Sequence, residues 1–291
     1  MTKLSDIKND KPKRNYLEDI SIVMAVYNHE ETVAEAIESA LMQEMPYKSV
    51  IHCLNDASTD KSAEILDNYR RKYPDKIKVY TSSENQGSGK KSFYHNKPSV
   101  IGRYWCLLAG DDYWTATDKL SKQISFLNEN KEYAGCSCNT LMKNEVTGEE
   151  SVIKPDRNNW NLYDLILLRN KYAFYVHTSS IVWRNIFIEN GFFLPPKFRR
   201  KKFFGDVILM HMMLSRGGKV FNIQEVMSCY RVTGRGVWSK MTEVEKKSMN
   251  KKVIDNIACS IPYKCQIILK LQNLRRFSKY FEMKIPGPIN E

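Results

Sequence analysis

The order of elements near the start of the chain restricts the fold more than any other feature. A β-branched run at 20–26 is followed by a polar break and then by apolar residues at helical spacing. The same order of strand, polar loop and helix then recurs, and Pro74 ends the second helix. The predicted strands are 20–26, 49–54 and 77–81, and the predicted helices are 33–41 and 61–73. Such alternation predicts parallel βαβ units, whose ligands bind beyond the carboxyl ends of the strands.

A further apolar run, Tyr104–Ala109, stops abruptly at Gly110 and two adjacent carboxylates, Asp111 and Asp112. Neighbouring carboxylates repel each other unless a positive charge lies between them, and oxygen ligands of this kind hold hard divalent cations. Mg²⁺ or Mn²⁺ bridging a diphosphate is the natural occupant, and Trp114 could help to shape the pocket. The alternative is an exposed acidic turn without a ligand.

The rest of the pattern is mixed. It predicts a helix at 119–127, a hairpin around 145–150, a strand at 179–183, a turn at Pro195 and Pro196, a helix at about 206–214 and basic amphipathic helices from 242 onward, for example 257–274. No internal repeat or low-complexity segment is present. The pattern gives only a weak indication of a domain boundary, near residue 240.

Composition and charge limit the class of protein. The 291 residues are 42% hydrophobic and contain 13 Gly and 10 Pro, which excludes a disordered or collagen-like chain. With 45 Lys and Arg against 33 Asp and Glu, the net charge is +12, so an anionic partner is expected. Nucleic acid, an acidic membrane surface and a phosphorylated small molecule all fit. The surplus is concentrated at 240–291 and at 197–202.

Location and redox state are also expected from the sequence. No stretch approaches the roughly 18 apolar residues of a spanning helix, and residues 1–15 contain no apolar core of a signal peptide, so a cytoplasmic location is expected. The seven cysteines have no CxxC spacing, which argues against both a disulfide framework and a zinc site. We expect them to be reduced and mostly buried.

Three further segments carry candidate residues. Asp56 follows the second strand and could accept a hydrogen bond from a base or ribose, whereas Ser58, Thr59 and Asp60 are better explained as turn and capping residues. Asp206 opens a helix, where a carboxylate is either a cap or, if it faces a cleft, a general base.

Arg231, Arg235 and Trp238 lie in a glycine-spaced segment that suits either a flexible anion clamp or a solvated basic loop. The histidines share no metal-ligand spacing, and each is interpreted as structural, with His177 the exception to watch. Neither GxGxxG nor GxxxxGK[ST] occurs where a phosphate-binding loop would need it.

Several blocks together resemble a known family. In order and spacing they resemble the family 2 glycosyltransferases of bacterial surface-polysaccharide assembly, such as capsule and lipopolysaccharide, over about residues 18–240. The blocks are 23–28 (VMAVYN), 55–60 (NDASTD), 85–87 (NQG), 108–114 (LAGDDYW), 176–180 (VHTSS), Gly205-Asp206 and 230–239 (YRVTGRGVWS). The resemblance implies a GT-A fold of α/β class, a Rossmann-like, mostly parallel sheet flanked by helices. It also implies a nucleotide-diphosphate sugar donor, a divalent metal and inversion at the anomeric carbon.

The resemblance also assigns roles to residues. It implies nucleotide contacts by Ala25, Tyr27, Asn28, Asp56, Gly87, Lys91 and Asp111, a metal site of Asp111 and Asp112, Asp206 as catalytic base, and diphosphate or acceptor contacts by Arg231, Arg235, Trp238, Trp114 and His177. The chain departs from the family where Ala25 replaces a usual Pro, Ala109 an acidic residue and Thr233 a frequent His. The last departure leaves Arg231 and Arg235 to neutralise the leaving group and puts strict metal dependence in question.

Partners and organisation follow as expectations. The resemblance implies a UDP-sugar as donor, Mn²⁺ or Mg²⁺ as cofactor and a saccharide acceptor, which we expect to be lipid-linked. The predicted organisation is a charged arm at 1–17, a nucleotide-sugar half at 18–115, an acceptor half with the base at 116–240 and a basic helical tail at 241–291. The tail could lie on the anionic inner face of the cell membrane or pack on the domain.

Other functions stay open at this stage. A basic nucleic-acid-binding protein would explain the charge, although no nucleic-acid motif is present and we expect no nucleic-acid partner. A catalytically weak family member acting as a scaffold, a glycoside hydrolase and a homodimeric assembly are likewise left to experiment.

Overall fold

The computed structural model describes residues 18–85, 87, 102–168, 176–185, 205–215, 217–236, 241–242 and 244–245. Its described strands form one ten-stranded sheet in the order β3-β2-β1-β4-β9-β6-β10-β5, with β7 paired to β6 and β8 to β10. The strands are β1 Ile20–Val26, β2 Ser49–Asn55, β3 Ile77–Thr81, β4 Tyr104–Ala109, β5 Tyr113–Trp114, β6 Tyr133–Asn144, β7 Glu150–Ile153, β8 Asn159–Trp160, β9 Val182–Arg184 and β10 Lys219–Val232. The helices are α1 Val33–Leu41, α2 Ser62–Lys72, α4 Lys119–Glu129, α5 Leu162–Leu168, α7 Gly205–Ser215 and a short 3₁₀ turn, η3 Thr178–Ser180.

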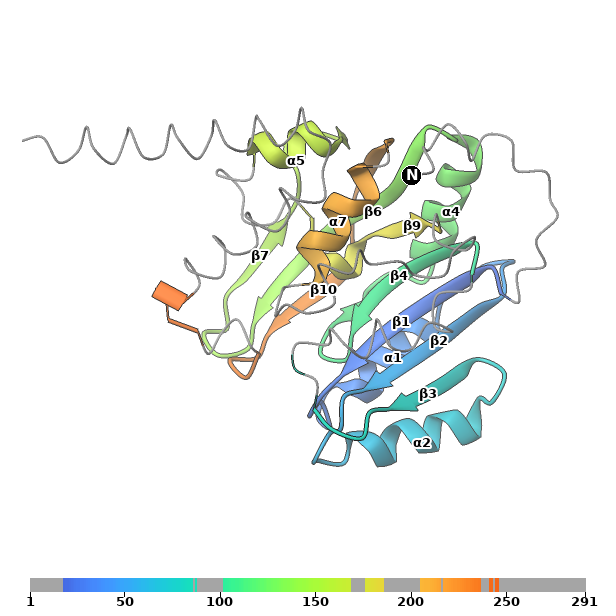
Figure 1. Cartoon of the computed structure of the whole chain (residues 1–291), viewed down its shortest axis with the longest axis vertical. Coiled ribbons are helices and arrows are strands. Elements are labelled where there is room, and N and C mark those ends of the chain that lie inside the picture. Colours follow the sequence, from blue (N-terminus) through green and yellow to red (C-terminus); the bar gives the residue numbers. More distant parts are fainter. Residues whose placement is uncertain are drawn as a thin grey trace, which may run out of the picture.

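The first part of the sheet is the parallel βαβ array that the sequence predicts (Figure 1). β1 lies between β2 and β4 and pairs with both in parallel, and β2 pairs with β3 in the same direction. Helix α1 forms because its apolar residues recur every three or four positions, which places Val33, Ile37 and Ala40 on one buried stripe.

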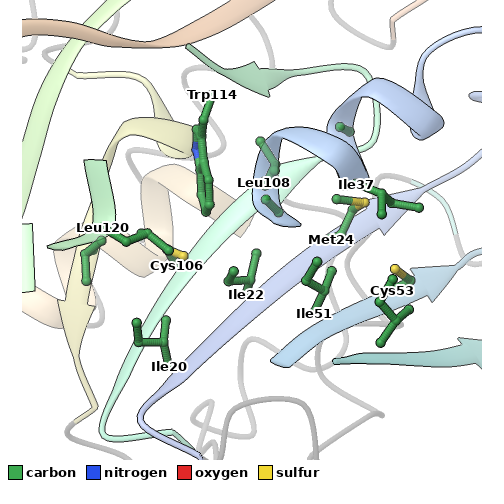
Figure 2. Close-up of a cluster of buried hydrophobic side chains, with 14 of the residues drawn as sticks. Ile20, Ile22, Met24, Ile37, Ile51, Cys53, Cys106, Leu108, Trp114 and Leu120 are labelled. Atoms are coloured by element: carbon green, nitrogen blue, oxygen red, sulfur yellow. The ribbon is translucent and has the colours of Figure 1, made fainter. Parts of the chain in front are cut away.

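The core of this half forms where that helix meets the sheet. Figure 2 shows Met24 of β1 with Ile37 of α1 and Ile51 of β2 close by. Each of these side chains is at least 98% buried. Burial of an aliphatic side chain of this size contributes about 1.5 to 3 kcal/mol. The packing therefore fixes the strand ends from which the first two loops leave.

The second part of the sheet is built on two long strands. β9 pairs antiparallel with β4 on one side and with β6 on the other, and β6 and β10 run parallel over most of their length. β1, β2, β4, β6 and β10 consequently share one direction, so their carboxyl ends meet at one edge of the sheet. Strands from both predicted halves, 18–115 and 116–240, share this sheet.

Two expectations about local structure need correction. The strand predicted at 179–183 is split: Thr178–Ser180 form a 3₁₀ turn, and β9 begins at Val182. The turn forms because the His177 side chain accepts the Ser179 N–H and so caps it. The segment from Tyr230 to Val232 is not a loop, since it forms the end of β10, paired to β6.

The other predicted elements within the described residues are confirmed, including the 145–150 hairpin between β6 and β7 and the helix at 205–215. The predicted turn at 195–196, the helices at 242–291 and the basic cluster at 197–202 lie outside the described residues, apart from a few positions after 240. Five cysteines are described, and all are buried and free, as expected. In the part of the chain that the structure covers, no helix has the length and apolar character needed to span a membrane.

Candidate functional site

Two loops at the carboxyl ends of β1 and β2 are bound tightly to each other; we call them the paired loops (residues 27–32 and 56–61). Side chains from each loop accept main-chain N–H groups of the other. The donor and acceptor pairs are Asn28 N to Ser58 Oγ (3.1 Å), Glu30 N to Asp60 Oδ2 (3.0 Å), Thr59 N to Asn28 Oδ1 (2.8 Å) and Lys61 N to Glu30 Oε2 (3.0 Å). The loops therefore form one preorganised platform, in which Ser58 and Asp60 accept main-chain N–H groups of the other loop and Thr59 donates one to it.

Positive backbone φ angles explain how the loops turn so tightly. Asn28 has φ of 54° and Ala57 has φ of 56°, in the left-handed region that L-residues rarely adopt. Asn tolerates this conformation because its short polar side chain can bond locally. Tyr27, just before Asn28, is 44% exposed and leaves β1 at the same edge.

Asp56 and Gly87, both predicted nucleotide contacts, lie together. The Asp56 side chain is almost fully buried, and its Oδ2 accepts the N–H of Gly87 at 3.1 Å. Gly87 has φ of 73°, a conformation that favours glycine. Lys91 lies outside the described residues. Ala25 contributes through its main chain, since its carbonyl accepts the N–H of Gly110 at 2.9 Å and so joins β1 to the acidic turn.

His29 is a neighbour of the acidic pair that sequence reasoning missed. Its Nε2 lies 3.8 Å from Oδ2 of Asp111, and both side chains are about one-fifth exposed. The imidazole fits because residue 110 is glycine: a Cβ there would lie 2.7 Å from His29 Nδ1. Thr32 adds a hydrogen bond from its hydroxyl to the Gly110 carbonyl at 2.8 Å. Only the fold brings His29 and Asp111, 82 positions apart in the sequence, together.

Asp112 is the buried member of the pair, with 3% of its surface exposed. Its Oδ1 accepts the main-chain N–H of Arg231 at 3.2 Å, and its Oδ2 lies 3.9 Å from His177 Nδ1. The N–H is available because the antiparallel pairing of β10 with β5 stops at Cys229 and Tyr113. Burial, reinforced by the charge of Asp111, raises the pKa of Asp112 well above its ordinary value. A cation at this position would relieve that cost.

His177 closes the other side of Asp112 as a neutral group. Its ring stacks on Tyr230 with centroids 4.4 Å apart, and its Nδ1 lies 2.7 Å from the hydroxyl of Ser179, which in turn contacts Ser228 at 2.8 Å. The Ser179 N–H also points to Nδ1, so this nitrogen acts as an acceptor. Burial lowers the pKa of His177 to about 4. At neutral pH the ring is therefore uncharged and forms no ion pair with Asp112.

Arg231 and Arg235, the predicted diphosphate contacts, both have carboxylate partners in this structure. The Arg231 guanidinium is 8% exposed, contacts Glu35 of α1, lies 3.1 Å from Glu145 through Nε and packs 4.5 Å from the centre of the Tyr113 ring. Burial opposes its charge, but the hydrogen bond and charge of Glu35 and the charge of Glu145 outweigh it and raise its pKa.

Arg235 is 70% exposed and pairs with Glu31 at 2.9 Å. Both arginines thus already contact carboxylates. Nothing local in the sequence marks Glu35 or Glu145 as their partners.

The remaining predicted residues fall into two groups. Trp114 is a correction: it lies in the core at 1% exposure, donates its Nε1–H to the Ser179 carbonyl at 2.9 Å and presents no surface to a ligand. Burial is favourable for its large apolar ring, whose centre lies 4.4 Å from Nζ of the buried Lys119. Asp206 lies in the first turn of α7, and its side chain is outside the described part of the structure. Trp238 is also outside it.

The donor set fits a hard divalent cation only in part. Asp111 and Asp112 supply adjacent carboxylate oxygens, and burial together with the charge of Asp111 raises the pKa of Asp112, so a nearby cation would favour its ionised form. Among the described residues, no group of three or more His, Cys, Asp or Glu side chains could hold an ion without further ligands. Phosphate oxygens commonly complete a Mg²⁺ or Mn²⁺ site of this kind.

Comparisons with known proteins place the chain in a family. A family model described as Glycosyl transferase family 2 matches residues 21–191. An uncharacterised protein of Mycobacterium tuberculosis is 27% identical over 228 residues, which cover 75% of this chain and 60% of that protein. The poly(ribitol-phosphate) beta-glucosyltransferase of Bacillus spizizenii is 33% identical over 115 residues, 38% of this chain and 18% of that enzyme. The chain thus spans less than two thirds of the length of these relatives.

Solved structures show the same fold. TarS 1–349 of S. aureus in complex with UDP-GlcNAc superposes with a TM-score of 0.63 at 17% identity, covering 92% of this chain and 76% of that one. The mannosyltransferase PcManGT of Pyrobaculum calidifontis, in complex with GDP-Man and Mn²⁺, gives a TM-score of 0.61 at 15% identity over 92% and 74%. The fold is GT-A, of α/β class, as the sequence resemblance implied.

Proposed function

Because the chain belongs to glycosyl transferase family 2, we propose that it transfers a sugar, with inversion, from a UDP-sugar to a saccharide acceptor. The observation that carries the proposal is the buried carboxylate of Asp112 beside Asp111, at the edge of the sheet where the platform of paired loops also ends. A buried carboxylate whose pKa is raised by burial and by a second carboxylate is suited to bind a cation that arrives with a ligand.

The donor would bind along the carboxyl edge of β1, β2 and β4. Asp56 faces the Gly87 N–H from one side of this edge, and the exposed ring of Tyr27 lies beside Asn28. A base and ribose fit this polar, preorganised surface, and the diphosphate would then lie toward Asp111. The solved neighbours carry UDP-GlcNAc and GDP-Man, which supports a nucleotide sugar as the ligand class.

The reaction we propose is a single displacement. The Asp206 carboxylate removes the proton from an acceptor hydroxyl while that oxygen attacks the anomeric carbon and the bond to the nucleoside diphosphate breaks. A divalent cation held by Asp111 and Asp112 would supply positive charge to the departing diphosphate. The Arg231 N–H donates to Asp112 Oδ1 and orients this carboxylate, and the neutral ring of His177 packs beside it. Arg235, with a solvent-exposed side chain, is the arginine able to exchange its carboxylate partner for a phosphate.

The proposed acceptor rests on the basic tail, most of which lies outside the described residues, and on one relative. The basic tail at 241–291 would place the enzyme on an anionic membrane surface at the inner face of the cell membrane, near a lipid-linked saccharide. One relative is a poly(ribitol-phosphate) beta-glucosyltransferase, which supports a cell-surface polymer as acceptor. Among the described residues, 26 Asp and Glu stand against 18 Lys and Arg, so this part of the chain offers no basic surface surplus for nucleic acid.

A thermal-shift screen tests the proposed function. The full chain is heated with UDP, GDP and their sugar conjugates, each with Mn²⁺ and with EDTA. Stabilisation by a uridine nucleotide that depends on Mn²⁺ is the expected result, because binding to the folded state alone raises the melting temperature. No response to any nucleotide under either condition would overturn the proposal.

A transfer assay with the donor so identified then tests the base. Asp206→Asn should lose most of its transfer rate while it still binds the donor. Nearly unchanged transfer by this variant would show that another group takes the proton.

A further inference from the structure

Four side chains from four segments form a compact cluster beside Asp112, which we call the Arg231 cluster: Arg231 of β10, Glu35 of α1, Glu145 of the β6–β7 turn and Tyr113 of β5. The guanidinium lies between the two carboxylates and over the aromatic ring. A second contact ties the turn to β10, since the Glu145 N–H donates to the Val232 carbonyl at 3.1 Å. The cluster therefore joins four segments that lie far apart in the sequence.

The charges of this cluster do not suit an anion-binding site. One guanidinium at 8% exposure faces two carboxylates, so the cluster carries net negative charge, and the ring of Tyr113 covers a face of the cation. A phosphate approaching Arg231 would have to displace Glu35 or Glu145. The exposed Arg235 and Glu31 pair, four residues away on each segment, has no such enclosure.

The cluster is connected to Asp112 through the main chain of Arg231. The Arg231 side chain is fixed by the glutamates, and the N–H of the same residue donates to Asp112 Oδ1. A donor held at fixed geometry orients its acceptor, and residues one step behind a metal ligand commonly control its affinity. Holding the side chain from two sides thus restricts where the N–H can point.

We propose that Glu35 and Glu145 are positioning residues, which clamp Arg231 so that its main-chain N–H orients the Asp112 carboxylate toward a diphosphate-bound cation. This inference rests on the proposed function and adds two residues that act through Arg231 and touch neither substrate nor cation. It also changes the role of Arg231 from a direct phosphate contact to the central residue of the clamp.

Simple electrostatics and the positioning role predict opposite changes in UDP affinity when either glutamate is replaced by glutamine. Replacing a glutamate by glutamine beside the site removes a negative charge and should by itself strengthen the binding of an anion. Positioning predicts weaker binding, and only when the cation is present. Glu31→Gln serves as the matched control, because it removes the same charge from the same end of α1 and breaks the corresponding ion pair with Arg235.

The experiment measures the UDP affinity of the full chain by calorimetry, with Mn²⁺ and with EDTA, for the wild type, Glu35→Gln, Glu145→Gln and Glu31→Gln. We expect the first two variants to weaken binding about 10-fold in Mn²⁺ and to leave the EDTA value within about 2-fold. Glu31→Gln should bind UDP as tightly as the wild type or more tightly in both conditions, because it removes a negative charge and frees Arg235. If Glu35→Gln fails to fold, Arg231→Lys replaces it, since lysine keeps the N–H and the charge but cannot bridge two carboxylates.

The outcomes separate the two proposals. If the wild type itself shows no Mn²⁺-dependent UDP binding, the proposed function fails, and this inference falls with it. If the wild type binds but Glu35→Gln and Glu145→Gln match Glu31→Gln, the positioning role is overturned while the proposed function stands. Equal losses in Mn²⁺ and in EDTA would indicate a general loss of structure and would also overturn it.

Discussion

The paired loops and the surroundings of Asp112 lie at the same edge of the sheet and are built on opposite principles. The loops are held by hydrogen bonds between polar side chains and main-chain N–H groups, and most of these atoms stay partly exposed. Around Asp112 the structure instead buries a carboxylate, a guanidinium and a neutral imidazole within a few ångströms of one another. A partly exposed platform of this kind forms at little cost without a ligand, whereas a buried charge is costly until a cation arrives.

The largest expected effect is on catalysis at the charged region. Asp112→Asn should lower the transfer rate by a factor on the order of 10² to 10³, because the amide cannot hold a cation in the same way. The fold should be retained, since the amide oxygen can still accept the Arg231 N–H. Single-turnover transfer with the identified donor measures this, and circular dichroism checks the fold. A rate within a few-fold of the wild type would contradict the role of Asp112.

The pH dependence of stability is the next largest effect. Burial places the pKa of His177 at about 4 in the folded protein, below its ordinary value of 6.5. The unfolded chain therefore binds more protons between these values, and stability present above pH 6.5 is lost as pH falls toward 4. The loss should amount to at most about 3 kcal/mol.

His177→Gln should flatten this part of the profile, measured as the free energy of unfolding in urea from pH 7 to pH 4. An identical slope in the wild type and the variant would exclude His177 as its source. In the paired loops, burial raises the pKa of Asp60, but hydrogen bonds from Ser62 and from the Glu30 N–H outweigh it and lower that pKa below 3.8. The effect of Asp60 on stability therefore falls mostly below this pH range.

The same substitution that harms catalysis should stabilise the protein without a ligand. The pKa of Asp112 is raised by burial and by Asp111, so its ionisation costs stability as pH rises through the folded pKa. In EDTA at pH 7, Asp112→Asn should gain about 1 to 2 kcal/mol of unfolding free energy. The gain should vanish at acid pH, where the wild-type carboxyl is protonated. A lower stability of the variant at pH 7 would show that the carboxylate already has a stabilising partner.

At the paired loops the effects should be smaller and independent of the cation. Asn28→Ala removes the acceptor of the Thr59 N–H and leaves at positive φ a side chain that cannot form a local hydrogen bond. We expect a cost of about 1 to 2 kcal/mol. Asn28→Gly loses the same acceptor but tolerates the φ, so the difference between the two variants measures the backbone term alone. Thermal unfolding would provide both values. Equal effects would mean that the conformation at residue 28 carries no strain.

The smallest effect should come from the exposed ion pair. Arg235→Gln breaks the contact with Glu31, which should cost less than about 0.5 kcal/mol because solvent screens both charges. Urea unfolding checks this value. A loss above 1 kcal/mol would place Arg235 among the structural residues.

The sequence predicted the parallel half of the sheet well because its signals are local. Strand β1 and helix α1 have apolar residues at the required spacing, and the acidic pair follows β4 directly. The long pair β6 and β10 gave no such signal. Ser137, Asn139 and Asn222 lie buried between these strands and bond to one another, so polar residues stand where alternation of apolar side chains would have revealed a strand.

The candidate site divides in the same way. Asp56, Asp111 and Asp112 follow strands and could be found from the sequence and the family resemblance. His29, Glu35 and Glu145 could not, because each acts on a residue far along the chain and carries no motif of its own. The charge of Arg231 suggested a phosphate contact, and only the fold shows that two carboxylates already enclose it.

We infer that the buried carboxylate of Asp112 binds a cation that enters the site together with the nucleotide. The most direct test is the UDP affinity of the wild type and of Asp112→Asn, each measured by calorimetry in Mn²⁺ and in EDTA at pH 7.5. We predict that Mn²⁺ strengthens UDP binding to the wild type at least about 10-fold and has no effect on the variant. Equal affinities of the wild type in Mn²⁺ and EDTA, or the same Mn²⁺ effect in both proteins, would contradict the claim.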